Sequence, residues 1–363
     1  MRDLRSWARV APFALAALLI SACGGGGDGD QSPRVQYTSL VTFGDSLSDV
    51  GTYATATLKA ASGGRGEYSV NGTVGVNWTE LLAAQARVPA PCAAQTGLES
   101  SGPLAAFAQA IANHSGCTSY AQGGARVTNP IGVANKAVIA FGDTSGYLGQ
   151  LTVPVVTQIA NHLTAVGGKF SGTELVTVLA GGNDVFANLA AVSGGAATPA
   201  QAVQAMGQAG AELAAYVKAS IVGNGATRVV VINLPDVSQT PLAYATDTAT
   251  QGLINTMVTT FNAQLHAGLA GTSGVLEVDA YTQGRDQNAQ PDKYALTNVT
   301  TPACDLAKLG ATLFASSLVC SGATLIPGDV SHYEFADTVH PTPFGYSLLA
   351  RYVAEQMISA GWL

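Results

Sequence analysis

The stretch that decides the fold is Leu40-Val41-Thr42-Phe43-Gly44-Asp45-Ser46-Leu47-Ser48-Asp49. Its hydrophobic beginning predicts a buried strand over residues 37–43. Gly44 then interrupts the strand pattern and predicts a turn, which places the hydroxyl of Ser46 directly after the strand. A helix is predicted to follow over residues 48–60. Strand, turn and helix in this order are typical of an α/β protein whose chemistry lies at strand ends.

Further apolar runs alternate with helical patterns along the rest of the chain. The runs predict strands at residues 174–180, 228–234 and 274–278. Helices are predicted from Asn77 onward and over residues 155–166, 199–222, 253–269 and 344–357. Strands that are apolar throughout are typical of a parallel sheet covered by helices on both faces. Two stretches, residues 90–150 and 281–335, lack a regular pattern and are expected to form loops.

A carboxylate and an imidazole stand three residues apart near the C-terminus, as Asp337 and His340, directly before Pro341. Serine, histidine and aspartate are the parts of a hydrolytic triad. In such a triad Ser46 would be the nucleophile and His340 the general base, with Asp337 holding the imidazole. The chain has no G-x-S-x-G elbow around Ser46, which counts against an ordinary α/β-hydrolase.

Four other histidines compete for the role of base. His162 and His266 lie on predicted helices and are expected to be packing or surface residues. His114 lies in the irregular stretch. His332 lies close to Asp337 in the sequence, so it is the alternative that the sequence leaves open.

The segments around Ser46 and His340 resemble the first and last signature blocks of the GDSL, or SGNH, family of serine esterases and lipases. That family has two further blocks between them, and both have matches here. They are Ser119-Tyr120-Ala121-Gln122-Gly123-Gly124-Ala125 and Ala180-Gly181-Gly182-Asn183-Asp184. Four ordered blocks, each at a plausible strand end, are far more specific than any one of them.

The resemblance implies a fold and an oxyanion hole. The fold is a three-layer α/β/α sandwich with a mostly parallel, about five-stranded, flavodoxin-like sheet. The oxyanion donors would be the backbone N–H of Ser46, the N–H of Gly124 and the side-chain amide of Asn183. Gly123 stands beside Gly124, and Gly124 is chosen because the family's donor precedes a small residue. Asp45, Asp49 and Asp184 are expected to be structural supports of their turns.

The activity implied by the resemblance is hydrolysis of a carboxylic ester through an acyl-enzyme, which needs no cofactor and no metal. The form of residues 43–49 resembles the branch with bacterial extracellular lipases, phospholipases and plant GDSL lipases. The expected partner is therefore an ester or lipid substrate. A carbohydrate acetyl esterase and an acyltransferase would use the same triad and remain alternatives. A surface lipoprotein without catalysis is the contrasting possibility.

The N-terminus is predicted to be a targeting segment. Basic residues precede an apolar run at residues 10–20, which ends in Leu19-Ile20-Ser21-Ala22-Cys23. This ending resembles a bacterial lipobox and implies a signal peptide over residues 1–22, acylation of Cys23, and a flexible tether over residues 23–36. Residues 37–363 would be one hydrolase domain. An ordinary secretory signal that leaves Cys23 as an odd thiol is the alternative.

The compartment follows from the same resemblance. Gly24, rather than an aspartate, follows Cys23 and implies an exported lipoprotein of a Gram-negative outer membrane, or a secreted protein. A lipid anchor would make the membrane a partner.

Charge and cysteine content exclude two other classes of protein. The chain of 363 residues has a formal net charge of -7, only 11% charged residues and no basic stripe, so nucleic-acid binding is excluded. Four cysteines remain besides Cys23: Cys92, Cys117, Cys304 and Cys320. They allow three pairings, of which Cys92 with Cys117 and Cys304 with Cys320 is favoured because each would staple an irregular stretch. Their spacing and the scattered histidines do not fit a structural zinc site.

Overall fold

The structure is a computed structural model that describes residues 35–72, 77–313 and 315–363. The predicted signal peptide, the acylation site Cys23 and the tether up to residue 34 lie outside these residues. No helix within the described ranges is both long enough and apolar enough to cross a membrane.

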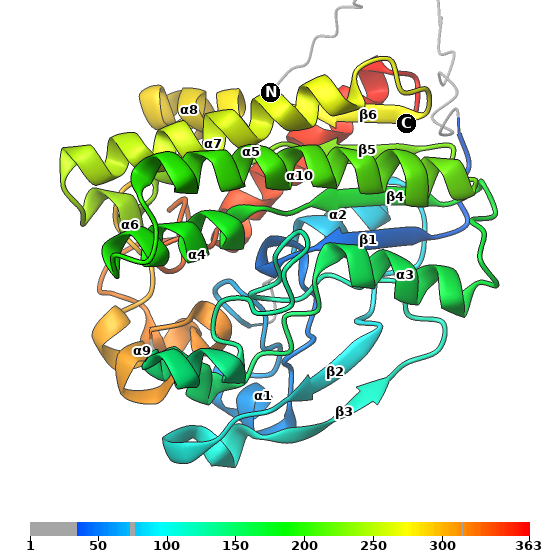
Figure 1. The fold of residues 1–363 in the computed structure, drawn as a ribbon. Coiled ribbons are helices and arrows are strands. Elements are labelled where there is room, and N and C mark those ends of the chain that lie inside the picture. The colour runs from blue at the N-terminus through cyan, green and yellow to red at the C-terminus, as the bar shows by residue number, and fades with distance from the viewer. Residues whose placement is uncertain (1–34, 73–76, 314) are drawn as a thin grey trace, which may run out of the picture. The chain divides into compact units, whose positions relative to one another are not determined.

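A parallel sheet of four strands lies at the centre of the fold (Figure 1). Its order is β1-β4-β5-β6, with the bounds Leu40–Gly44, Leu175–Leu179, Val229–Ile232 and Val275–Val278. Each strand pairs in parallel with its neighbour, as in the register of Thr42 opposite Thr177. Ser46 follows β1 at the carboxyl edge of this sheet, where α/β sheets carry their sites.

The fifth strand of the predicted sheet is reduced to a short bridge beside β1. Thr42 donates its N–H to the Thr118 carbonyl (3.0 Å) and accepts the N–H of Tyr120 (2.8 Å). Counting residues 118–120 as the second strand in chain order gives the arrangement 2-1-3-4-5, which is the flavodoxin-like order. The predicted three-layer fold is therefore confirmed, with four full strands in place of about five.

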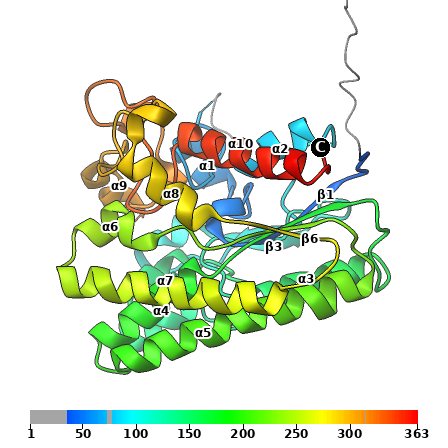
Figure 2. The same cartoon turned by 90° about the horizontal axis from the view of Figure 1, so that it is seen from above.

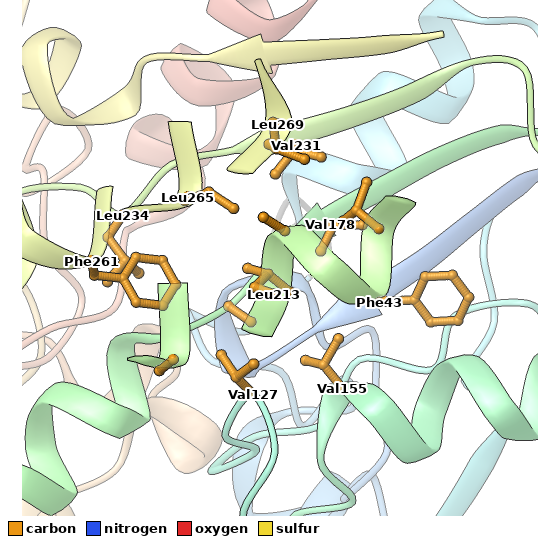
Figure 3. Packing of buried hydrophobic residues seen from close by; sticks show 14 of the residues in the cluster. Phe43, Val127, Val155, Val178, Leu213, Val231, Leu234, Phe261, Leu265 and Leu269 are labelled. Atoms are coloured by element: carbon orange, nitrogen blue, oxygen red, sulfur yellow. The ribbon is translucent and has the colours of Figure 1, made fainter. Parts of the chain in front are cut away.

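Alternate residues of the strands face two different layers of helices. Val41, Val176 and Val229 belong to a core that also holds residues of α3, α5 and α7. Leu40 and Val230 belong to the opposite core, with residues of α2 and α10. Figure 2 shows these two groups of helices on the two sides of the sheet, and Figure 3 shows the packing of the first core. Burial on both faces explains why the strands are apolar throughout.

The helices have the following bounds: α1 Ala56–Ser62, α2 Trp78–Gln85, α3 Val155–Ala165, α4 Gly182–Ser193, α5 Pro199–Tyr216, α6 Pro241–Tyr244, α7 Thr248–Leu269, α8 Ala280–Ala289, α9 Leu306–Leu313 and α10 Pro343–Ser359. Capping explains where some of them begin. Asn77 caps α2 in a capping box with Glu80, and Thr198 caps α5 in the same way with Gln201, one residue before Pro199.

The predicted helix over residues 48–60 is wrong in its first half. Ser46–Ser48 form a single 3₁₀ turn, and α1 begins only at Ala56. The reason is the side chain of Asp49, whose Oδ1 accepts the N–H groups of Gly51 (2.9 Å) and Thr52 (2.7 Å). A side chain that bonds to the following backbone in this way favours a turn over a helix.

The two stretches predicted to be irregular contain more structure than their patterns indicate. Residues 90–150 include a two-stranded antiparallel sheet, β2 Gln95–Leu98 and β3 Gln109–Asn113. Residues 281–335 include most of α8 and all of α9. The sequence pattern does not indicate β3 or α8, because β3 is exposed throughout and α8 is rich in polar residues, so neither has an apolar stripe.

These two stretches share a third hydrophobic cluster beside the main sheet. It contains Tyr53, Tyr68, Leu98, Leu148 and Leu318, among others. The predicted disulfide pairing is present: Cys92 bonds to Cys117, with their Cα atoms 5.0 Å apart, and Cys304 bonds to Cys320, at 6.0 Å. The second disulfide lies inside the third cluster. The stretches that look like loops are therefore a packed layer held by covalent links.

His162 on α3 is a buried packing residue, as the sequence indicates. Its ring lies among those of Phe43, Tyr120 and Phe170, at centroid distances of 5.8, 5.3 and 4.7 Å. Only 1% of the residue is exposed, and neither ring nitrogen has a hydrogen-bond partner in the described part of the chain. Burial lowers the pKa of His162, and the nearby carboxylate of Glu174 offsets only part of this effect.

This burial predicts a specific loss of stability in acid. The unfolded chain protonates His162 near its ordinary pKa of about 6.5, whereas the folded protein resists protonation, so the free energy of unfolding falls as the pH drops below that value. We expect His162→Leu to lose less stability than the wild type between pH 7.5 and pH 5, measured by urea unfolding. His266→Leu is the matched control, since the His266 side chain is 74% exposed. Equal acid slopes for wild type and His162→Leu would contradict this account.

Candidate active site

Ser46 is positioned by the close packing of β1 against β4 and α3. A Cβ atom on Gly44 would lie 2.2 Å from the carbonyl oxygen of Leu179, so only glycine allows β1 to end so close to its neighbour. Gln158 of α3 accepts the N–H of Gly44 (2.9 Å) and donates to its carbonyl (2.8 Å). Asp45 caps the 3₁₀ turn that carries Ser46 by accepting the N–H of Leu47 (3.1 Å). The serine therefore sits on a turn that is fixed on both sides.

The structure brings together the three residues that the sequence proposes as a triad. The Oγ atom of Ser46 lies 2.8 Å from Nε2 of His340. Nδ1 of the same imidazole lies 2.7 Å and 3.0 Å from the two carboxylate oxygens of Asp337. Because Nδ1 faces a carboxylate and donates to it, Nε2 is left as the acceptor for the serine hydroxyl. These distances meet the geometric requirement for activating a serine.

Asp337 is buried, with 3% of its surface exposed, and its carboxylate accepts three backbone N–H groups as well as the imidazole. Oδ1 accepts from Val339 (2.9 Å) and His340 (2.8 Å), and Oδ2 accepts from Ser317 (2.9 Å). Burial alone would raise the pKa of this carboxyl. The charge of His340 and the hydrogen bonds outweigh burial and hold the pKa of Asp337 well below its usual range. Asp337 is therefore ionised at neutral pH.

Two contacts of this site lie outside the signature blocks and were missed by the sequence reading. The ring of Tyr68 packs on the imidazole of His340 with 4.7 Å between centroids. The N–H of Ser317, which holds Asp337, comes from the stretch between Cys304 and Cys320. No short motif marks either residue, because their roles depend on the packing of the third cluster.

The competing histidines are far less suited to act as base. His332 stacks on Phe344 and its Nδ1 contacts the carbonyl of Ala295 (2.8 Å). His114 contacts the hydroxyl of Thr96, and His266 pairs with Glu277. His340 alone among the five histidines contacts Ser46.

The two glycines of the second block differ in what their N–H groups contact. Gly123 donates to Oδ2 of Asp49 (2.9 Å), so its N–H is engaged, and Asp49 acts as the expected structural support. The N–H of Gly124 has no acceptor among the residues that the structure describes. A side chain is excluded at Gly124, which has a φ of +78° and where a Cβ atom would lie 2.3 Å from the Val133 carbonyl. These contacts favour Gly124 over Gly123 as the donor available to a ligand.

Asn183 lies in the first turn of α4 and lines the same pocket as Ser46. Its Nδ2 donates one hydrogen to the carbonyl of Ala125 (2.9 Å), which leaves the second hydrogen for a ligand. The next residue, Asp184, accepts from Arg126 Nε (2.9 Å) and Val127 N–H (3.0 Å). Asp184 therefore ties the second and third blocks together, which is the supporting role expected of it.

Asp45 is a second buried carboxyl beside Ser46. Burial raises its pKa to about 7, although the N–H of Leu47 and the nearby His340 act in the opposite direction. Its hydrogen bond goes to Leu47 and not to the imidazole. The carboxylate that pairs with His340 is thus Asp337, and Asp45 supports the turn.

A pocket of about 130 Å³ opens beside Ser46, Asn183 and His340. Most of its lining is apolar, from Leu47, Phe186, Leu234, Pro235, Val237, Ala280, Phe335, Val339, Pro341 and Leu349. Besides Ser46, Asn183 and His340, the polar residues that line it are Asp45, Asp236, Gln239, Thr240, Gln283, Gln287, Asn288 and Glu334. Within the described residues, no group of three or more His, Cys, Asp or Glu side chains could hold a metal ion.

The serine, histidine and aspartate form one hydrogen-bonded chain at the carboxyl edge of the sheet. This is the active-site geometry of the serine hydrolases as a class. A family model described as GDSL-like Lipase/Acylhydrolase matches residues 40–353. The chain therefore belongs to the GDSL-like lipase/acylhydrolase family, and this membership supports a hydrolase activity on an ester or acyl substrate.

Comparison with curated proteins found no match. Among solved structures, the chain is similar to LAE5, described as an alpha/beta hydrolase enzyme from the metagenome of Lake Arreo, Spain. The two are 13% identical, and the match covers 89% of this chain and 95% of that chain with a TM-score of 0.40.

Proposed function

We propose that the protein is a serine-dependent carboxylic ester hydrolase that works through an acyl-enzyme on Ser46. The observation that carries the proposal is the hydrogen-bonded chain from Asp337 through His340 to Ser46, at 2.7 and 2.8 Å, which opens into a mostly apolar pocket. Family membership supports the same reaction class.

The reaction proceeds in two halves. His340 Nε2 takes the proton of Ser46 as Oγ attacks the ester carbonyl carbon, and then gives that proton to the oxygen of the leaving alcohol. In the second half His340 takes a proton from water as the water oxygen attacks the acyl carbon. The bond between that carbon and Oγ then breaks, His340 returns the proton to Oγ, and the acid and free Ser46 are released. Asp337 stays ionised throughout and stabilises the imidazolium that forms between the two proton transfers.

The negative oxygen of each tetrahedral intermediate needs donors that are already in place. The N–H of Ser46, the N–H of Gly124 and the second hydrogen of the Asn183 amide supply them in this proposal. Arg126 and Asp184 keep the last two segments together, so the donors do not have to reorganise during the reaction.

Removal of the Asn183 amide should slow the chemical step. We expect Asn183→Ala to lower kcat by about a hundredfold or more, because the donor acts on charge that develops in the transition state. Asn188→Ala is the matched control: Asn188 lies on the same helix and donates to a backbone carbonyl, that of Asp184 (2.8 Å), but does not line the pocket. A defect of Asn183→Ala confined to KM would contradict the role of this residue.

Labelling with a fluorophosphonate probe tests the proposal against a surface protein without catalysis. Labelling that disappears in Ser46→Ala supports a serine enzyme, and absence of labelling in the wild type would contradict the proposal. A panel of p-nitrophenyl esters, acetylated xylan and an alcohol acceptor then separates three uses of the same triad: an esterase or lipase, a carbohydrate acetyl esterase and an acyltransferase.

Export and attachment through an acylated Cys23 are proposed together with the activity. The two disulfides support export, since such bonds form and persist in oxidising compartments. Mass spectrometry of the mature N-terminus is the direct test, and an unmodified Cys23 in the mature protein would contradict the anchor.

A further inference from the structure

Tyr68 supports the imidazole of His340 without lining the pocket. Its ring packs on the imidazole with 4.7 Å between the centroids and 33° between the planes. Only 4% of Tyr68 is exposed, and the pocket lining includes His340 but not Tyr68. Tyr68 can therefore influence the reaction only through the groups that it contacts.

The hydroxyl of Tyr68 reaches the second signature block through the buried amide of Gln150. It donates to the amide oxygen of Gln150 (2.5 Å), whose NH₂ group donates to the carbonyls of Gly123 (3.1 Å) and Val133 (3.2 Å). The amide takes this orientation because the opposite one would turn its oxygen toward the two carbonyl oxygens. Burial raises the pKa of the Tyr68 phenol well above its usual range, so the hydroxyl keeps the proton that it donates.

The carbonyl of Gly123 has a second donor, the hydroxyl of Tyr53 (2.7 Å). The N–H of Thr152 donates to the same hydroxyl oxygen (3.3 Å), which leaves the Tyr53 proton for Gly123. The rings of Tyr53 and Tyr68 lie edge to face, with 6.3 Å between centroids. Two buried tyrosines, one directly and one through Gln150, thus hold a single carbonyl group.

This carbonyl belongs to the same planar peptide group as the N–H of Gly124. In a trans peptide the C=O and N–H bonds point in opposite directions, so holding one of them fixes the direction of the other. The carbonyl accepts two hydrogen bonds, whereas the N–H has no acceptor among the described residues. Donors on the carbonyl also polarise the peptide group and strengthen its N–H as a donor. The peptide group is therefore held with its N–H ready for an acceptor from outside.

Tyr68 also explains why residue 123 is a glycine. A Cβ atom on Gly123 would lie 2.0 Å from the Tyr68 hydroxyl oxygen, so a side chain there would push the tyrosine away. Gly124 has its own reason, a positive φ and the nearby Val133 carbonyl. The two adjacent glycines thus serve different purposes, one for the backbone of the donor and one for the tyrosine behind it.

We propose that Tyr68 is a positioning residue that holds the general base and an oxyanion donor in one arrangement. Its ring supports the imidazole of His340, and its hydroxyl, through Gln150, fixes the peptide group that carries the Gly124 N–H. Tyr53 holds the same peptide group from its carbonyl end. This inference rests on the proposed ester hydrolysis for the roles of His340 and Gly124.

The first test removes one hydroxyl and keeps the ring. We expect Tyr68→Phe and Tyr53→Phe each to lower kcat on p-nitrophenyl acetate about tenfold with KM unchanged, because the donor acts on charge that develops in the transition state. Tyr37→Phe is the matched control: the Tyr37 hydroxyl donates to the Trp362 carbonyl (2.9 Å) in the core beside α10. It should leave kcat unchanged, and a wild-type kcat in Tyr68→Phe would overturn the proposal.

A thionoester separates an oxyanion effect from a general loosening of the site. In the thionoester of the same acid and phenol, sulfur replaces the carbonyl oxygen and accepts hydrogen bonds only weakly. We expect Tyr68→Phe and Tyr53→Phe to reduce the preference for the oxygen ester, while Tyr37→Phe keeps it. An equal loss on both substrates would show that the hydroxyls do not act through the oxyanion donor.

Tyr68→Leu tests the ring. It should lower kcat about tenfold beyond Tyr68→Phe on the ester and the thionoester alike, since both reactions need the imidazole to be held in place. Equal rates for Tyr68→Leu and Tyr68→Phe would contradict the part assigned to the ring. Tyr68→Phe decides the part of the hydroxyl even if Tyr68→Leu does not fold.

The last test does not depend on turnover. Glycine labelled with ¹³C at the carbonyl and with ¹⁵N makes glycine–glycine peptide groups visible by NMR, including that of Gly123 and Gly124. We expect the carbonyl resonance of Gly123 to move in Tyr53→Phe and in Tyr68→Phe, which keep the ring currents, and to stay in place in Tyr37→Phe. An unmoved resonance in Tyr68→Phe would overturn the inference. If the wild type hydrolyses no ester, the proposed function fails, and this resonance still decides whether Tyr68 fixes the peptide group.

Discussion

Ser46→Ala is expected to abolish ester hydrolysis, with a loss in kcat of roughly 10⁴- to 10⁶-fold as in other serine enzymes that lose their nucleophile. The physical reason is that no other hydroxyl contacts Nε2 of His340 within the described residues. The fold should not change, because the Ser46 hydroxyl bonds only to His340 among the residues that the structure describes, and the turn is held by Asp45 through the N–H of Leu47. Initial rates on a p-nitrophenyl ester and a far-UV circular dichroism spectrum check the two parts.

Ser48→Ala is the matched control for that result. Ser48 lies in the same 3₁₀ turn, is buried, and accepts the indole N–H of Trp78 (3.2 Å). Its removal leaves the indole unpaired and should lower stability by about 1–3 kcal/mol while hydrolysis continues. Near wild-type hydrolysis by Ser46→Ala would refute the proposed mechanism.

Asp337→Asn is expected to lower kcat by about 10⁴-fold while the protein remains folded. An asparagine can keep its oxygen in the place of Oδ1, where the N–H groups of Val339 and His340 donate. Its NH₂ group then faces the N–H of Ser317 and Nδ1 of His340, where the native carboxylate accepts. Nδ1 must become the acceptor, so Nε2 carries the hydrogen and can no longer take the proton of Ser46.

The pH dependence of the rate separates this tautomer effect from a loss of structure. A wrong tautomer lowers the rate across the neutral range and can be partly relieved at high pH, whereas unfolding would also change the circular dichroism. Asp305→Asn is the control, because Asp305 caps α9 at the surface and an asparagine can do the same. An Asp337→Asn enzyme within tenfold of the wild type would show that another group orients His340.

The sequence predicted most of the sheet and the three triad residues, for a clear physical reason. Strands buried on both faces are long apolar runs, and the residues of the site follow them directly, as Ser46 follows β1 and Asn183 follows β4. Asp337 and His340 were recognisable because their segment resembles the last of four ordered family blocks, since a carboxylate and an imidazole three residues apart are common in proteins. The local sequence pattern was enough to predict an element wherever its structure is determined by residues that are neighbours in the chain.

What the sequence did not predict depends on contacts between distant segments. Asp49 forms a local turn with Gly51 and Thr52, and the N–H of Gly123, far along the chain, donates to the other oxygen of the same carboxylate. Helix α8 lacks an apolar stripe, yet it carries Asn288 to the pocket. Tyr68 packs on the imidazole of His340, and the backbone N–H of Ser317 donates to Asp337, but both residues are distant in the sequence from the residues they contact. The spacing of apolar residues along the sequence does not reveal such long-range contacts.

The disulfide between Cys304 and Cys320 has a consequence for how the enzyme matures. The segment it closes supplies the Ser317 N–H that fixes the acid of the proposed triad. A newly synthesised chain in a reducing cytosol would lack this disulfide. The Ser317 N–H would then hold Asp337 less firmly, and Asp337 would orient the imidazole of His340 less firmly. Under the proposed export, oxidative folding outside the cytosol would complete the support of Asp337, so that hydrolytic activity would develop only after the chain has left the cytosol.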